Sequence, residues 1–446
     1  MAAYSRPFAA LGQADRCMAL FDEPDRYRDL FAALEEPHVI AQGAGLSYVA
    51  AGFDSAAVAV SMRRFNRLLA ADLPPDGETG WVEAEAGITL GKLFSFLTPR
   101  GYFLTVQPGH PQLTLGGLIA ADVHGKNHYK EGVFSGLVEQ LTLHHPDHGT
   151  MLLSRTERPN LFDLTCGGFG LTGAILSARI RVVRIPAHRV RVRNAPVSSL
   201  LDTCRYLREA AQDYDMLQSW NDLSRLGPGA GFVISGRYEQ DGPAPEIPEP
   251  LPYTWLDPHD PQHYRPHLFR RTTMPIINAA YAFNETRRKS NRRKTLFDYI
   301  YPVARKSFYF DWYGPRGFIE HQVLIPTDAA TSYFTDLLAL LRRHDHAVPR
   351  ASMKLFRGNP RLLTYNGSGY SFSMDLFDTP QSRRVLADID RLDVHHGCRA
   401  NIIKDSRLSA DTVRAQYATY GAVRARLVAH DPKRRFVSLL SRRLEL

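Results

Sequence analysis

Short apolar runs separated by glycine-rich turns dominate the first 188 residues of the chain. Residues 37–42 predict a buried strand that leads into a glycine turn, and residues 80–87 alternate with the period of a half-buried strand. Residues 89–97 instead have helical spacing, with Thr89 as the N-cap. This part of the chain therefore predicts short strands and helices joined by tight turns.

A strand with basic residues on its outward face, at residues 178–186, is predicted to end the first domain. The region after it combines both periodicities, with helices expected near 198–212 and 331–344 and strands at 231–236, 319–325 and 370–376. Because strands and helices do not strictly alternate, the pattern favours an α+β fold over a parallel doubly wound sheet. The proline-rich and acidic stretch at 240–253 predicts an exposed loop.

The composition is typical of a soluble globular protein, with 44% apolar and 23% charged residues, and the length of 446 residues predicts two domains. The four cysteines are far apart in the sequence, so we expect reduced, mostly buried thiols and neither a disulfide scaffold nor a metal site. The N-terminus lacks the pattern of a secretory signal, and no apolar run is long enough to span a membrane. These features predict a cytoplasmic protein.

A formal net charge of +9 comes largely from two basic groups. One occupies residues 287–294, and the other comprises residues 433–435 with Arg442 and Arg443. Such clusters attract phosphates, anionic lipids or nucleic acid, although a solvated basic loop explains the charge equally well. No zinc-finger, helix-turn-helix or RNA-binding pattern accompanies them, so no nucleic-acid partner is predicted.

Three glycine-rich segments give the first indication of a ligand. Residues 42–48 follow the first predicted strand, and their backbone N–H groups could turn toward a phosphate, although an ordinary tight turn uses the same residues. Residues 167–173 hold four glycines directly before a strand. None of the three segments has the spacing of a Rossmann or P-loop motif, which argues for a dinucleotide bound in another geometry.

The segment at residues 108–128 is the richest of the three. Gly116 and Gly117 allow the backbone to approach a flat or anionic ligand closely. Four hydrogen-bonding side chains follow within five residues: His124, Lys126, Asn127 and His128. Because burying so many polar groups without a ligand is costly, this block predicts a binding site.

The order of these segments resembles the FAD-binding domain of the vanillyl-alcohol oxidase superfamily. The blocks at 124–128, 354–356, 404–407 and 442–446 are similar to the decaprenylphosphoryl-β-D-ribose 2′-oxidase family, and the resemblance covers nearly the whole chain except residues 240–300. It implies a two-part FAD-binding domain of the PCMH type at residues 1–188. An α+β substrate domain built on an antiparallel sheet would follow at 189–398, and residues 399–446 would return to the FAD-binding domain.

The resemblance also assigns residues to the cofactor. The pyrophosphate of FAD would be held by Gly43, Ala44, Gly45, Leu46, Ser47 and Tyr48. The flavin and its ribityl chain would be lined by Gly109, Thr114, Leu115, Gly116, Gly117, Ala121, Asp122, Val123 and His124, with Ile175 and Asn401 flanking the cofactor. Some members of the superfamily attach FAD through a histidine at the position of Leu46, so FAD should be bound non-covalently here.

In that family a lysine of the 404–407 block lies over the flavin near the substrate, so the resemblance gives this role to Lys404. The substrate pocket would be lined by Trp220, Tyr313, Gln322, Lys354 and Ser373. Ser373 stands where the family has a cysteine that captures covalent inhibitors. This difference removes thiol-directed inhibition and leaves the identity of the substrate open.

The implied reaction is the FAD-dependent oxidation of a secondary hydroxyl on a sugar, namely the 2′-hydroxyl of a polyprenyl-phosphate-linked pentose, as the first half of an epimerisation. Such a reaction needs a base for the hydroxyl proton and positive charge near the forming oxyanion. Lys404 is predicted to activate the alcohol or, alternatively, to pair with a substrate phosphate. His124 or Lys126 would hold the flavin and stabilise charge on its reduced ring.

The implied partners are a glycosyl-phosphate lipid, an NAD(P)H-dependent keto-sugar reductase and the inner face of the membrane, which the basic cluster at 287–294 would contact. Two other interpretations stay open. The same fold could serve an oxygen-using alditol or aldonolactone oxidase, or the chain could be a basic binding protein without a cofactor.

Overall fold

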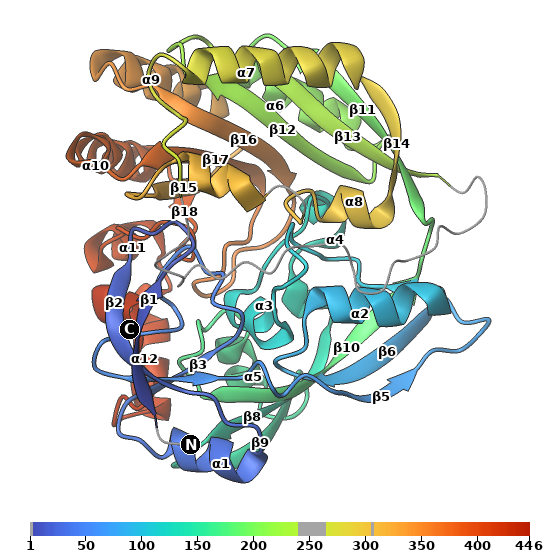
Figure 1. The fold of residues 1–446 in the computed structure, drawn as a ribbon, viewed down its shortest axis with the longest axis vertical. Coiled ribbons are helices and arrows are strands. Elements are labelled where there is room, and N and C mark those ends of the chain that lie inside the picture. Colours follow the sequence, from blue (N-terminus) through green and yellow to red (C-terminus); the bar gives the residue numbers. More distant parts are fainter. Residues whose placement is uncertain (1–2, 240–264, 305–306) are drawn as a thin grey trace.

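The computed structural model describes residues 3–239, 265–304 and 307–446, and Figure 1 shows how they are arranged. Within these residues the chain forms three sheets, two built from the first part of the sequence and a large one built from the middle. The exposed loop predicted at residues 240–253 lies outside the described residues. The mixture of helices and largely antiparallel sheets confirms the predicted α+β class.

The first sheet presents the glycine turn at residues 43–48. In sheet order its strands are β1 (Tyr4–Ala9), β2 (Arg16–Asp22), β4 (Val58–Ser61) and β3 (Val39–Gln42). Strands β2, β4 and β3 run parallel, and helix α1 (Tyr27–Leu34) packs its buried Leu30 and Leu34 against them. Strand β3 is short and apolar, as its sequence predicts, and the chain enters the glycine turn directly from its end.

The second sheet is antiparallel and is centred on β10 (Ala174–Arg184). The other strands are β5 (Leu68–Asp72), β6 (Thr79–Glu85), β7 (Tyr102–Phe103), β8 (Val138–His145) and β9 (Gly149–Ser154). Its helices are α2 (Leu90–Leu97), α3 (Leu115–Ala121), α4 (His128–Glu131) and α5 (Pro159–Thr165). The Thr89 side chain accepts a hydrogen bond from the Lys92 N–H, which confirms the predicted cap of α2.

The third sheet is antiparallel and follows the order β14-β11-β13-β12-β16-β17-β15-β18. Its strands are β11 (Arg189–Val197), β12 (Met216–Leu223), β13 (Gly231–Glu239), β14 (Asn291–Thr295), β15 (Phe318–Ile325), β16 (Val348–Phe356), β17 (Gly369–Phe377) and β18 (Arg399–Ala400). The helices of this region are α6 (Leu200–Ala210), α7 (Met274–Phe283), α8 (Leu296–Ile300), α9 (Ala330–Arg343) and α10 (Pro380–His395).

The two faces of the third sheet differ in character. Alternate residues such as Phe372 and Met374 of β17 face α6, α9 and α10 and form one hydrophobic core with them. The residues between them, such as Ser371, Ser373 and Asp375, point to the other face, toward the first two sheets. A polar sheet face thus overlies the glycine-rich segments.

The last part of the chain returns to the first two sheets, where Figure 1 shows its helices beside β1 and β2. Helices α11 (Ala410–Gln416), α12 (Tyr420–His430) and α13 (Leu439–Arg443) share a core with Val49 and Leu164. The change from the second to the third sheet falls between β10 and β11. The division into domains at residues 188 and 398 stays a prediction.

Cys17, Cys166, Cys204 and Cys398 are all unpaired, and the last three are buried, as predicted. In the described parts of the chain, no helix combines the length and the hydrophobicity needed to cross a bilayer.

Candidate active site

A cavity of about 440 Å³ lies between the polar face of the third sheet and the glycine-rich segments. Most of the residues that the sequence assigns to a ligand line it: Gly43, Ala44, Gly45, Leu46, Ser47, Tyr48, Gly109, Thr114, Gly116, Gly117, Ala121, Asp122, Val123, His124, Lys126, Ile175, Gln322, Lys354, Ser373, Asn401 and Lys404. The structure thus brings together residues that are more than 350 positions apart in the sequence.

The turn after β3 offers backbone donors to the cavity. Gly45 has a φ of 71°, which favours glycine, and a Cβ on Gly43 would lie 2.1 Å from the Thr114 hydroxyl oxygen. Within the described chain, the N–H groups of residues 43–47 donate hydrogen bonds to no other protein group. An unpaired row of N–H groups beside a cavity suits an anion such as a diphosphate.

The walls formed by residues 109–121 are open and smooth. A Cβ on Gly109 would meet no heavy atom closer than 3.9 Å, and one on Gly117 would meet only the Thr114 side chain, at 3.2 Å. These positions therefore leave room for a flat ring. Leu115 lies on the opposite side of α3, where it is fully buried in the core of the second sheet and does not line the cavity.

Three of the four polar side chains at residues 124–128 bind protein groups outside this segment. Lys126 Nζ donates to the carbonyls of Tyr299 and Ile300, at 2.8 and 2.7 Å, near the C-terminus of α8. Asn127 donates to the Thr105 carbonyl, and the His128 ring lies 3.0 Å from the Asn366 side-chain oxygen. The expectation that these groups need a ligand is therefore wrong for Lys126, Asn127 and His128, because distant parts of the chain satisfy them.

His124 and Lys126 are not placed as free cations. Burial lowers the pKa of both side chains well below their usual values. His124 Nδ1 lies 3.1 Å from the Gly125 carbonyl, so it is the ring nitrogen that carries the proton of a neutral imidazole. His124 therefore contributes a neutral ring to the cavity, and Lys126 anchors α8 over it. Their predicted role in stabilising the reduced flavin stays a prediction.

Two rows of polar side chains cross the third sheet above the cavity. Glu320, Asp375 and Arg350 are cross-strand neighbours on β15, β17 and β16. Gln322, Ser373 and Ser352 form the next row. Asn401 donates to Gln322 Oε1 at 2.6 Å, and Arg350 pairs with Asp375 at 2.9 Å. Such a surface can bind a ligand with many hydroxyls.

Lys404 lies where this surface meets the glycine turn. Its Nζ is 3.4 Å from Glu320 Oε1 and 3.4 Å from the centre of the Tyr48 ring. Burial lowers the pKa of Lys404, and Glu320 opposes that shift. Burial and the nearby Lys404 lower the pKa of Lys354 to about 8. Unlike that of Lys404, the side chain of Lys354 makes no hydrogen bond or ion pair within the described residues.

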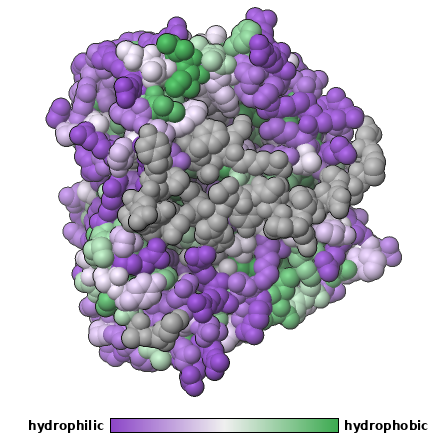
Figure 2. Space-filling view, in the orientation of Figure 1, coloured by the Kyte–Doolittle hydropathy of each residue, from purple (hydrophilic) through white to green (hydrophobic). Residues whose placement is uncertain are grey.

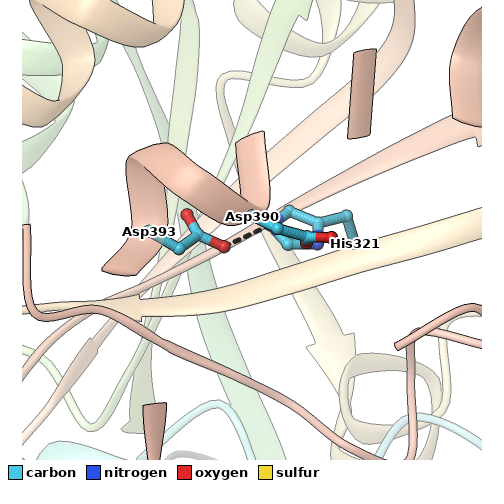
Figure 3. Close-up of side chains that lie close together, drawn as sticks. All are labelled: His321, Asp390 and Asp393. Atoms are coloured by element: carbon cyan, nitrogen blue, oxygen red, sulfur yellow. Dashed lines mark ion pairs between the residues drawn. The ribbon is translucent and has the colours of Figure 1, made fainter. Parts of the chain in front are cut away.

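A buried ion-pair cluster on the opposite face of the sheet holds the loop that carries Lys404. His321 of β15 lies 2.9 Å from Asp405 and 3.1 Å from Asp393 of α10, and Figure 3 shows it beside Asp390 and Asp393. Arg407 pairs with Asp405 and Asp390, at 3.0 and 2.5 Å. Although burial opposes it, Asp393 and Asp405 raise the pKa of His321 to about 10.

His321, Asp390 and Asp393 are close enough to ligate a metal ion. Arg407 and the protonated His321 already neutralise these carboxylates, however, and a metal would have to displace both cations. We therefore interpret the group as an ion-pair cluster.

Two predicted substrate residues lie away from the cavity wall. Trp220 stacks on Phe232 and contacts Tyr281 of α7. Tyr313 packs among aromatic rings and donates a hydrogen bond of 3.3 Å to Asp375, and it does not line the cavity. The cavity is lined instead by Glu320, Arg350, Ser352 and Gln218, none of which belongs to a motif that predicted the site. The alternation of polar and apolar residues along β15 and β17 was the signal that could have found the polar face.

The comparison with known families agrees with this geometry. A family described as FAD binding domain matches residues 28–153, which contain the glycine turn and α3. The unpaired N–H groups fit the diphosphate of FAD and the open glycine walls fit its ring, while Leu46 offers no nucleophile for a covalent link. The chain is an FAD-dependent oxidoreductase that acts on CH–OH groups.

More specifically, the chain is similar to decaprenylphosphoryl-β-D-ribose oxidase of Mycolicibacterium smegmatis, with 28% identity over 92% of this chain and 89% of the relative. A Streptomyces coelicolor protein described as an uncharacterized protein in the mprA 5′ region is 27% identical over 80% of this chain and 100% of its own length. D-arabinono-1,4-lactone oxidase of Eremothecium gossypii is 30% identical over 28% of this chain and 23% of its own length.

Proposed function

We propose that this enzyme oxidises a secondary hydroxyl of a sugar that is joined through phosphate to a polyprenyl chain, and that the 2′-hydroxyl of a pentose is the reacting group. The product is a keto sugar, which an NAD(P)H-dependent reductase then reduces to complete an epimerisation. The observation that carries the proposal is the polar face of the third sheet, with two lysines, above a cavity that fits FAD. The whole-length similarity to an oxidase of a phosphoryl-linked ribose supports it.

Lys404 and Glu320 are the groups we assign to the reacting hydroxyl. Bound FAD supplies the acceptor for the hydride that leaves the carbinol carbon. The hydroxyl proton must go to the protein, and the Lys404–Glu320 pair, 3.4 Å apart, can accept one proton to give an ammonium beside a carboxylic acid. Lys404 can either relay this proton to Glu320 or hold the oxygen while Glu320 takes the proton directly. Both routes leave the pair in the same state.

Lys354 is the group we assign to the substrate phosphate. Arg350 is paired with Asp375 and Lys404 with Glu320, whereas Lys354 lines the cavity without such a pair in the described chain. A phosphate would restore a partner to this buried ammonium. This assignment separates the two roles that the sequence leaves open for Lys404.

Anaerobic bleaching of the flavin absorbance tests the proposed reaction. Polyprenyl-phosphate ribose should bleach the flavin within one turnover. The 2-deoxyribose analogue has the same lipid and phosphate but lacks the reacting hydroxyl, so it should bind without bleaching. Equal bleaching by both compounds would place the oxidised carbon elsewhere on the sugar.

A lactone or alditol oxidase is the second candidate, supported by the partial similarity to D-arabinono-1,4-lactone oxidase. An enzyme of that kind oxidises free polyols or lactones and passes the two electrons to dioxygen, which becomes hydrogen peroxide. Steady-state peroxide assays with free alditols, aldonolactones and the lipid-linked pentose therefore separate the two candidates.

A further inference from the structure

Helix α7 carries an apolar strip that no described part of the protein covers. Ile276 and Phe283 are 69% and 57% exposed, and the exposed Ala279 and Ala280 lie between them. The spacing of three to four residues places all of these side chains on one side of the helix. Figure 2 shows a hydrophobic patch over this end of the molecule, surrounded by hydrophilic side chains.

The inner side of α7 is fixed to the third sheet. Tyr281 contacts Trp220, and Asn278 donates hydrogen bonds to Asp222 and to the Pro349 carbonyl, at 2.8 and 2.9 Å. Pro349 directly precedes Arg350, which lines the cavity. The exposed strip is therefore a rigid surface attached to the cavity wall.

Basic residues flank the strip at both ends. Arg270 and Arg271 precede α7 and are exposed, although Arg271 pairs with Asp345. Arg287, Arg288 and Lys289 follow the helix, and Lys289 lies 3.9 Å from Glu285. Arg287 and Arg288 have no acidic partner among the described residues, and the Arg288 guanidinium lies 5.9 Å from the centre of the Phe283 ring.

Other basic residues of the run at 287–294 already pair with acidic side chains of the protein. Arg292 pairs with the buried Glu285 at 2.7 Å, and Arg293 pairs with Glu239 at 2.9 Å. The available charge therefore lies beside the apolar strip.

We propose that the α7 surface, defined as Ile276, Ala279, Ala280 and Phe283 with Arg287 and Arg288, docks on an anionic lipid bilayer. An exposed apolar helix face with cations at its ends matches the hydrocarbon and headgroup layers of such a surface. A second copy of the chain fits less well, because either antiparallel or parallel pairing of two α7 helices brings basic ends together. The inference is independent of the proposed substrate, although docking would bring a lipid-linked sugar to the cavity.

Flotation of the FAD-loaded enzyme with vesicles tests the surface without any sugar. Wild type should float with phosphatidylglycerol-containing vesicles and less with pure phosphatidylcholine, and added salt should release it. Arg287→Glu with Arg288→Glu should weaken binding about 25-fold or more, at about fivefold per lost cation. Ile276→Glu with Phe283→Glu should abolish binding.

Matched control variants separate this surface from general charge and hydrophobicity. Arg208→Glu with Arg384→Glu makes the same change of net charge at exposed helix positions. Leu69→Glu with Leu152→Glu replaces two leucines outside the strip, whose side chains are 48% and 45% exposed. Both controls should float as wild type does, and all variants should keep the flavin spectrum.

Three outcomes would overturn the inference. The first is a wild-type enzyme that does not bind anionic vesicles, and the second is an equal loss of binding in the control variants. The third is a wild-type dimer in sedimentation velocity that Ile276→Glu with Phe283→Glu converts to a monomer, which would assign the strip to a second copy. Flavin bleaching by a water-soluble short-chain substrate checks the proposed reaction separately from docking.

Discussion

Replacing His321 with glutamine should destabilise the protein in a manner that depends on pH. His321 is fully buried between Asp393 and Asp405, which raise its pKa from 6.5 to about 10. Because the pKa of His321 is higher in the folded than in the unfolded protein, the charged His321 stabilises the fold fully when the pH is below 6.5. This stabilisation is lost progressively as the pH rises from 6.5 toward 10. The shift corresponds to about 5 kcal/mol at its full extent, and breaking a buried ion pair costs about 3–5 kcal/mol. At pH 7 we therefore expect a loss of about 3–5 kcal/mol.

Urea unfolding of wild type and His321→Gln at several pH values measures this effect. The difference in unfolding free energy should shrink by about 1.4 kcal/mol for each pH unit between 7 and 9, because His321 releases its proton on unfolding in that range. His346→Gln is the matched control, since His346 is also buried but its pKa is lowered by burial. The difference in unfolding free energy between wild type and His346→Gln should not change between pH 7 and 9. A constant difference for His321→Gln would refute the charged state of the cluster.

Four further predictions concern the cavity. Lys404→Met should keep FAD and lower the rate of flavin bleaching by about 100-fold or more, measured by anaerobic stopped flow. Lys354→Met should raise KM for the phosphate-bearing substrate, and the fall of wild-type kcat/KM above pH 8, where Lys354 loses its proton, should be absent from its pH profile. Gly117→Val should place its side chain in the cavity and yield protein without the flavin spectrum, whereas Gly136→Ala, which meets no atom within 4 Å, should stay yellow. Ser373→Cys should form a maleimide adduct that substrate prevents, detected by mass spectrometry.

Local periodicity was enough to predict many elements. The helix predicted at residues 331–344 is α9 (Ala330–Arg343), and the strand predicted at 319–325 is β15 (Phe318–Ile325). These elements bury one face against a common core, so their pattern of apolar residues is fixed by the neighbours they pack against. The glycine segments were informative for a different local reason, because a turn that must leave space for a ligand excludes side chains.

The pairing of polar groups could not be predicted from the local sequence. Lys126 binds carbonyls at residues 299 and 300, and His128 binds Asn366, so their partners lie far along the chain. Glu320 and Arg350 reach the cavity only because the register of three strands aligns them with Asp375. Register is a property of the assembled sheet, so no local sequence pattern predicted that these two residues reach the cavity.

The run from Lys404 to Arg407 connects the cavity to the buried cluster. Lys404 faces the cavity, where it pairs with Glu320, whereas Asp405 and Arg407 bind the charges behind the sheet. Glu320 and His321 are adjacent on β15, so the two ion pairs lie on opposite faces of one strand. Two ion pairs between these short segments, Lys404 with Glu320 and Asp405 with His321, therefore hold both the loop and its lysine in place. A lysine held in this way loses little freedom when a substrate binds, which is the arrangement that proton transfer to a positioned group requires.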